Sequence, residues 1–227
     1  MRLRREAQKK AAELVPAIFL EMFGDPVANP RGWPVVALSD AADVQGGLQV
    51  TTKRASLPIE APYLRVANVY RSRLDLREIK SIRLTAAELK RTRLEVGDLL
   101  FVEGHGNPAE VGRCAAWDGS IANCTHQNHL IRARPDEDVL MSDFACTLLN
   151  SVSGRRTLVE TGKTTSGLST ISAQNVKQAK MILPPLNMQK TFEQRFESVQ
   201  SMSAQQASAL VIAEATFGAL LSRSFSI

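Results

Sequence analysis

The sequence has few of the residues that mark secreted, membrane-spanning or metal-binding proteins. Its three cysteines, Cys114, Cys124 and Cys146, are an odd number without framework spacing, which argues against a disulfide-stapled secreted domain. No apolar run reaches the roughly 18 residues of a membrane span, and no signal core with a cleavage site follows the basic residues 1–10. We therefore expect a cytoplasmic protein that does not work in a membrane.

Aromatic residues are also scarce, at 5% of the chain against 44% hydrophobic residues. This composition predicts a core built mainly from Leu, Val, Ile and Ala, in one moderate globular domain with extra helical segments. The net charge of +5 is compatible with a polyanion partner, because cationic side chains release counterions from a phosphate backbone. Charge alone does not identify that partner.

Catalytic and nucleotide-binding motifs are missing. The double proline Pro184-Pro185 lacks the flanking polar and aromatic residues of an amino-methyltransferase motif, so we expect it to mark the exit corner of a domain. Residues 104–109 match G-x-G-x-x-A, but no helix is expected to follow and face a pyrophosphate, and a tight hairpin is predicted instead. No Ser–His–Asp or Cys–His arrangement emerges. We expect a non-catalytic protein without a cofactor.

A zinc site could in principle use Cys114, Cys124, His126 and His129. Their spacing fits no common structural zinc motif, and the alternation around them suggests strands. We therefore predict no metal, and we interpret His126 as a polar reader or a hydrogen-bonded loop residue.

Three zones of different pattern predict an α+β fold. Residues 2–23 place apolar side chains three or four positions apart, as one helix face requires, and Pro16 should kink this helix or start a new one. Short strands are expected at 33–38, 63–70, 98–102, 111–117, 129–133 and 180–183, with helices at 84–89, opened by a Thr85/Glu88 capping box, and at 142–152. The expected units are an N-terminal helix (1–24), a β-rich domain (25–187) and a long C-terminal helix (188–227).

The long helix carries a heptad-like seam with a polar middle, where Ser203 and Gln206 share its register. One interpretation is an amphipathic helix packed on its own domain. The other is a coiled-coil arm, because a helix this long outreaches the domain and residues 2–23 cannot cover it all. The arm implies a second chain. The seam residues are Phe196, Val199, Leu210, Ala213, Phe217 and Leu220.

Four loops, at 45–54, 104–107, 123–128 and 162–169, are rich in the residue types that read base edges or bind phosphates. Lys163 is expected to neutralise a phosphate. For each loop the competing interpretation is a solvated connection. The candidate DNA-binding residues are Gln45, Gln49, Thr51, Lys53, Arg54, His105, Asn107, Asn123, His126, Gln127, Asn128, Lys163, Thr164, Thr165 and Ser166.

The order of these segments resembles that of type I restriction–modification specificity subunits. Each motif is loose, but together they cover essentially the whole chain. The segments that carry the resemblance are Glu21–Pro26, Asn29–Pro34 and Val35–Leu38 at the domain entry, Tyr63–Val69, Val96–Phe101, Gly106 and Val111–Arg113 in the middle, and Thr164–Ser172 and Ile182–Gln189 at the exit into a spacer helix.

The resemblance implies a double-stranded DNA ligand and large protein partners. A full specificity subunit has two target recognition domains, each reading half of a bipartite site. Two antiparallel helices set the gap between the half-sites and dock modification (methyltransferase) subunits, while a separate motor subunit cuts DNA. This chain shows one such domain and one long helix, so we expect either a half-subunit that forms a homodimer through the long helix or a fragment. A two-fold pair would favour a palindromic target.

Two other function classes compete with a DNA reader. One is a protein–protein scaffold whose long helix mediates assembly without reading DNA. The other is a stand-alone nuclease or methyltransferase, which the missing motifs disfavour.

Overall fold

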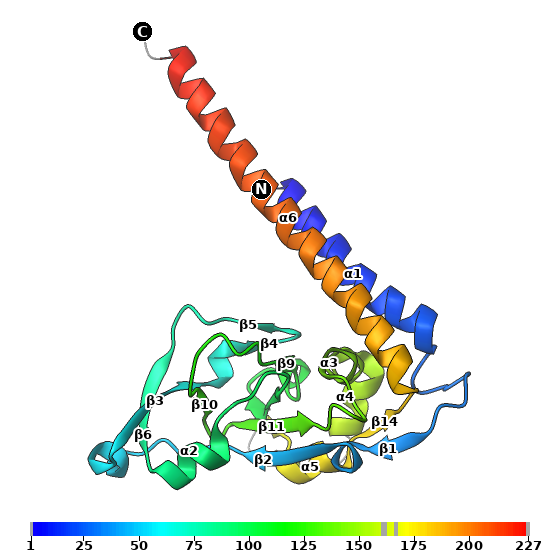
Figure 1. Cartoon of the computed structure of the whole chain (residues 1–227), viewed down its shortest axis with the longest axis vertical. Coiled ribbons are helices and arrows are strands. Elements are labelled where there is room, and N and C mark those ends of the chain that lie inside the picture. Colours follow the sequence, from blue (N-terminus) through cyan, green and yellow to red (C-terminus); the bar gives the residue numbers. More distant parts are fainter. Residues whose placement is uncertain (1, 160–162, 166–167, 226–227) are drawn as a thin grey trace.

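The computed structural model describes residues 2–159, 163–165 and 168–225. It confirms the α+β class: two helices project from a β-rich domain (Figure 1). In chain order the elements are α1 (Arg2–Phe23), β1 (Val35–Ala37), η1 (Leu38–Asp40), β2 (Ala42–Gly46), η2 (Thr52–Ser56), β3 (Ile59–Leu64), η3 (Val66–Asn68), β4 (Val69–Tyr70), β5 (Arg73–Leu74), β6 (Lys80–Leu84), α2 (Ala86–Thr92), β7 (Leu99–Val102), β8 (Gly104–His105), η4 (Pro108–Glu110), β9 (Cys114–Ala116), β10 (Thr125–His126), β11 (Leu130–Pro135), α3 (Ser142–Asn150), α4 (Val152–Val159), β12 (Lys163–Thr165), β13 (Leu168–Thr170), α5 (Ala173–Gln178), β14 (Lys180–Ile182) and α6 (Leu186–Phe225).

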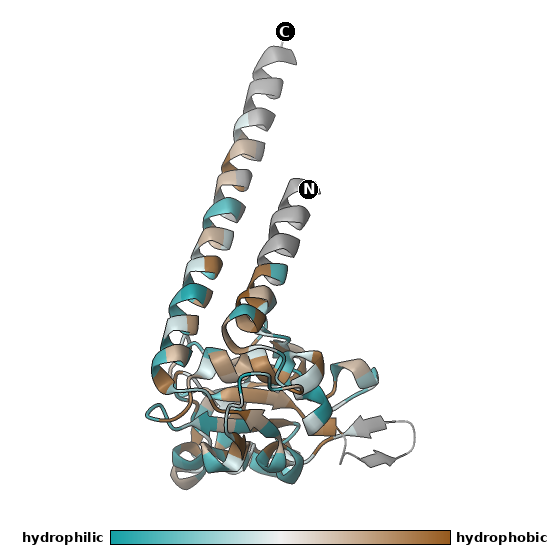
Figure 2. Ribbon diagram, turned by 90° about the vertical axis from the view of Figure 1, so that its right-hand side faces the viewer, coloured by the Kyte–Doolittle hydropathy of each residue, from teal (hydrophilic) through white to brown (hydrophobic). Residues whose placement is uncertain are grey.

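Helices α1 and α6 run antiparallel and side by side, and α6 continues past the N-terminal end of α1 (Figures 1 and 2). Helix α1 passes through Pro16 without a new start, contrary to one of the two outcomes expected there. Strand β1, which follows α1, pairs antiparallel with β14, which precedes α6, so the entry and exit of the domain lie together. None of the described helices is long and apolar enough to cross a bilayer.

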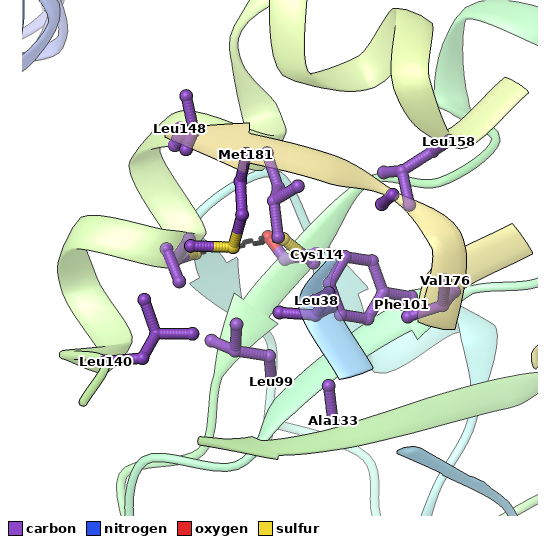
Figure 3. Close-up of a cluster of buried hydrophobic side chains, with 14 of the residues drawn as sticks. Leu38, Leu99, Phe101, Cys114, Ala133, Leu140, Leu148, Leu158, Val176 and Met181 are labelled. Atoms are coloured by element: carbon purple, nitrogen blue, oxygen red, sulfur yellow. Dashed lines mark hydrogen bonds between the residues drawn. The ribbon is translucent and has the colours of Figure 1, made fainter. Parts of the chain in front are cut away.

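The domain centres on an antiparallel sheet of order β2-β11-β7-β9. Beside it lies a three-stranded sheet, β10-β3-β6, in which β10 runs parallel to β3. Aliphatic side chains fill the core on one face of the central sheet (Figure 3). There, Leu99 of β7 and Ala133 of β11 meet Leu148 of α3 and Val176 of α5, and all four are almost fully buried. This part of the core matches the aliphatic composition predicted from the sequence.

The joint between the helices and the domain is aromatic instead. Phe19 and Phe23 of α1, Phe144 of α3 and Phe192 of α6 are buried together, with ring centroids 4.9 to 6.5 Å apart. Rings at these distances and angles add attraction beyond the burial of their area. Four of the few aromatic residues therefore fix the direction in which α1 and α6 project from the domain.

The predicted capping box is confirmed at the start of α2. The Glu88 N–H donates to the Thr85 hydroxyl (3.2 Å), and the Thr85 N–H donates to the Glu88 carboxylate (2.9 Å). This motif is local, so two residues three positions apart are enough to predict it.

The strand predicted at 63–70 is interrupted at 65–68: β3 ends at Leu64, and β4 covers Val69–Tyr70. Asn68 is buried and its side chain accepts the Arg65 N–H (2.8 Å), which turns the chain into η3. The Asn68 amide also donates to the carbonyls of Asp75 and Glu78, which lie in a later segment. A side-chain hydrogen bond to the backbone therefore replaces the strand ladder here.

The tight hairpin predicted at 104–109 is also wrong. Strand β8 turns away to pair with β13, and η4 follows it, capped by the Asn107 side chain, which accepts the Ala109 N–H (3.0 Å). Gly112 has a φ of +74°, so the expected strand at 111–117 is regular only over β9.

Candidate nucleic-acid interface

Two of the four predicted loops, 45–54 and 123–128, lie directly against each other. The Leu48 N–H donates to the His126 carbonyl and the Asn128 N–H donates to the Leu48 carbonyl, both at 2.9 Å. The Leu48 side chain is buried beneath this contact. Segments almost 80 residues apart in the sequence thus form one backbone-paired unit.

The close approach depends on Gly47. A β-carbon at this position would lie 2.3 Å from the carbonyl oxygens of both His126 and Gln127. Real carbon atoms essentially never come so near to oxygen, so only glycine fits without moving the backbone.

The other two loops, 104–107 and 162–169, also pair. Ser169 of β13 lies opposite His105 of β8, and β13 in turn pairs with β12. The Glu103 N–H joins this pair to the first one by donating to the His129 carbonyl (3.0 Å). Backbone hydrogen bonds therefore connect all four loops. We call residues 45–54, 103–107, 123–129, 163–165 and 168–170 the loop surface.

Most residues predicted on the first loop remain accessible. Gln49, Thr51 and Lys53 are exposed, and Gln45 is half-buried at the end of β2. These side chains stay available for contacts with a ligand.

The prediction that Arg54, on the same loop, contacts DNA has to be corrected. Its guanidinium makes an ion pair with Glu88 (2.9 Å) and donates to the Gln49 carbonyl (2.6 Å), and its side chain is only 15% exposed. The Arg54 hydrogen bond is also the main cause that lowers the pKa of Glu88 to about 2. Arg54 therefore fixes η2 against α2 instead of facing a ligand.

On the third loop, the prediction that His126 contacts DNA also has to be corrected. Its side chain is completely buried, and burial, helped by the nearby Arg132 charge, lowers the pKa of the imidazole to about 3. A neutral, enclosed ring cannot read a base edge. Asn123 is exposed, with a left-handed φ of +54°, and Gln127 and Asn128 are half-buried beside it in the chain.

The second loop holds His105 and Asn107. The His105 ring is half-buried and its Nδ1 accepts the Asn107 N–H (3.0 Å), while Asn107 is exposed at the start of η4.

On the fourth loop, the structure describes the backbone of Lys163, Thr164 and Thr165 in β12 but not their side chains, and Ser166 lies outside the described residues.

Two residues of the loop surface were missed as candidates. The His129 side chain is 61% exposed and its Nδ1 lies 3.0 Å from the Glu103 carboxylate. The sequence pattern places His129 at the start of the strand expected at 129–133 and in a zinc set of unsuitable spacing, so it is not among the DNA-binding candidates. Glu103 places an acceptor among the readers, where a carboxylate suits a base amino group and repels a phosphate.

Comparison with known proteins identifies the relatives of this chain. It is 33% identical over 143 residues to the type I restriction enzyme EcoKI specificity subunit of Escherichia coli strain K12. The match covers 61% of this chain and 30% of that protein. The chain is a relative of the type I specificity subunits. It is also 27% identical over 164 residues to the putative type I restriction enzyme MjaX specificity subunit of Methanocaldococcus jannaschii (71% of this chain, 38% of that protein). No protein-family model matches.

Solved structures show the same fold. A chain from a study of complex assembly and conformational transition of the type I R-M system matches 96% of this chain with a TM-score of 0.65 and 22% identity, over 51% of its own length. The HsdS subunit from Thermoanaerobacter tengcongensis matches 92% with a TM-score of 0.56 and 20% identity, over 48% of its length. This specificity-subunit relative thus spans about a third of the curated proteins it matches and about half of these solved chains.

The predicted seam of the long helix divides into two parts. Near the domain, Val199 is buried and Phe196 is half-buried against the core. Farther along α6, Ala213 is exposed, together with Val211 and Ile212, which the seam did not include. The side chains of Leu210, Phe217 and Leu220 lie outside the described residues. Within the described part of the specificity-subunit relative, the far half of α6 therefore carries exposed apolar side chains.

A groove of about 530 Å³ lies at the base of α6, between this helix and α3. Trp117 and Phe196 contribute to its apolar lining, and Asp143, Glu193 and Glu197 contribute carboxylates. Burial, followed by the Glu197 charge, raises the pKa of Asp143 to about 6, and burial also raises that of Glu193. Its carboxylates repel phosphate, so the groove does not suit a DNA backbone.

The raised pKa of Asp143 predicts a pH-dependent stability. The folded protein binds the proton more tightly than the unfolded chain, so stability falls as pH rises from about 4 to about 6 and stays low above that range. Asp143→Asn should therefore raise the free energy of unfolding by about 1–2 kcal/mol at pH 7.5 and change it little at pH 4. Urea unfolding at the two pH values measures this, and an equal effect at both would contradict the assignment.

Proposed function

We propose that this chain recognises a DNA sequence within a type I restriction–modification complex and performs no chemistry itself. The observation that carries the proposal is the connection within the loop surface: four segments rich in residue types that read bases are joined to one another by backbone hydrogen bonds. Such a surface places Gln, Asn, Thr and Lys side chains on a rigid support, as direct readout requires. The relationship to specificity subunits supports DNA as the ligand.

The proposed division of labour follows the three predicted units. Residues 25–187 read one half of a bipartite site, while helices 1–24 and 188–227 set the gap between half-sites and dock modification subunits. A motor or restriction subunit joins through these. We propose the cytoplasm as the place where the protein meets this DNA.

A second recognition unit is needed to complete the bipartite reading. We propose that a second copy supplies it by pairing along the far half of α6. The exposure of Val211 (52%) and Ile212 (63%) supports this, because burying such side chains stabilises association. An isologous pair would read a palindromic target.

Selection from a random duplex library tests the function. The chain, mixed with its modification subunit, should enrich one bipartite palindrome, and light scattering of the chain in the same buffer should report a dimer. A complex that forms without any enrichment would overturn DNA recognition and favour the scaffold alternative. Enrichment by a strict monomer would overturn only the pairing.

Two substitutions on the loop surface should separate base readout from phosphate binding. Gln127→Ala is expected to relax preference at one base pair by about 1–3 kcal/mol, because an amide reads a base edge. Lys53→Ala should weaken binding to all sequences and make the salt dependence shallower by about one unit of slope. Gln174→Ala, at an exposed position of α5 that is not one of the residues of the loop surface, is the control. The opposite pattern would reverse the two roles.

A further inference from the structure

Three arginines from distant segments converge on η4, directly after the second loop. Arg71 and Arg155 both donate to the Ala109 carbonyl, Arg71 at 2.9 Å. Arg113 makes an ion pair with Glu110 (2.8 Å). These contacts bring three guanidinium groups around a single turn of chain.

Their positive charge is only partly neutralised. Among the described residues, the ion pairs of Arg71 (3.9 Å) and Arg113 both go to Glu110, whose pKa is lowered chiefly by the Arg113 hydrogen bond. The Arg113 side chain is 7% exposed, so Glu110 is committed mainly to it. Arg71, 37% exposed, and Arg155, half-buried, share a neutral carbonyl oxygen instead, and two cations at one oxygen repel each other.

A fourth arginine extends this positive region. Arg73 is exposed and its guanidinium lies 4.6 Å from the centre of the Tyr70 ring, which Arg113 also approaches at 5.0 Å. Asp75, which attracts Arg73, is itself held by Arg77. The Arg73 charge thus remains available to an outside anion.

The arginines border the loop surface. Helix η4 begins immediately after Asn107, whose side chain accepts the Ala109 N–H (3.0 Å). An anion bound by the arginines would therefore lie next to whatever the second loop contacts.

We propose that Arg71, Arg73 and Arg155 bind phosphodiester groups of the DNA backbone that flanks the bases read by the loop surface. Guanidinium matches phosphate with two parallel hydrogen bonds, and a bound phosphate relieves the repulsion between Arg71 and Arg155. This site rests on the proposed function for its ligand. A purely structural role in holding η4 would change stability but not the salt dependence of binding.

Equilibrium binding of the chain with its modification subunit to a selected duplex and to an unrelated duplex, at several salt concentrations, tests the site. Arg71→Gln/Arg155→Gln should lower affinity for both duplexes and make the slope of log affinity against log salt shallower by about 0.9 per lost phosphate contact. Arg73→Gln removes no backbone hydrogen bond that the structure shows, and should reduce the slope by about half as much. Arg31→Gln/Lys180→Gln makes the same charge change at two exposed residues that have no hydrogen bond or ion pair to η4 among the described contacts, and it should leave the slope unchanged.

The outcomes separate the phosphate site from the proposed function. A wild-type slope in both η4 variants overturns the site, even if sequence selection by the wild-type chain stands. If the double variant unfolds, the Arg73→Gln slope decides. If the wild-type chain shows no sequence preference but the variants have a shallower salt slope, the phosphate site stands and the sequence readout is overturned. Loss of preference without loss of slope assigns the arginines to base reading and overturns the site.

Discussion

Replacing Phe192 by alanine is expected to lower the free energy of unfolding by about 3–5 kcal/mol. The side chain is fully buried, and its ring lies 5.7 Å from the rings of Phe19 and Phe23 and 6.5 Å from that of Phe144. The substitution removes the transfer energy of the ring and leaves a cavity at a joint of three helices, which cannot all close on it. No other position on α6 links α1 and α3 through so many described ring contacts.

Urea unfolding followed by circular dichroism measures the change. Thr191→Ala, at the exposed neighbouring position, is the matched control and should stay within about 0.5 kcal/mol of the wild type. If both variants lose the same small amount, the aromatic joint does not hold the helices to the domain.

Features that depend on near neighbours in the chain could be predicted from the sequence. The bounds of α1 and α6 follow from helical periodicity, and the capping box of α2 from the spacing of Thr85 and Glu88. The buried strand β7 follows from its unbroken apolar run. In each case the residues that determine the structure lie within a few positions of one another.

Features decided by distant partners could not be predicted. Arg54 is a residue type that often contacts DNA, but its guanidinium donates a hydrogen bond to Glu88, 34 positions away. His126 looks like a loop reader, but the packing of 45–48 and Arg132 encloses it. The arginines around η4 come from three segments with no common motif. The loops themselves were found by composition, whereas their adjacency depends on pairings such as Leu48 with Gln127.

That adjacency makes Gly47→Ala the substitution with the largest expected effect on recognition. The new methyl group would lie 2.3 Å from two carbonyl oxygens, and both are in use: the His126 carbonyl accepts from Leu48 and the Gln127 carbonyl from Leu130. The backbone must separate by about 1 Å or more to restore van der Waals distance. We expect a loss of about 1–3 kcal/mol in stability, typical of overpacking, and loss of preference at every base pair that 45–54 and 123–129 read together.

Gly46→Ala provides a control of the same chemistry one position away, because a β-carbon there meets no atom within 4 Å. Its stability and its selected sequence should match those of the wild type. The salt slope should stay unchanged in both variants, since neither removes a cationic side chain. If Gly47→Ala keeps the full preference, the two loops read their bases independently and the loop surface is not the unit of recognition. If it loses several adjacent base pairs at once while Gly46→Ala loses none, the contact between the loops, and not either loop alone, sets the sequence that is read.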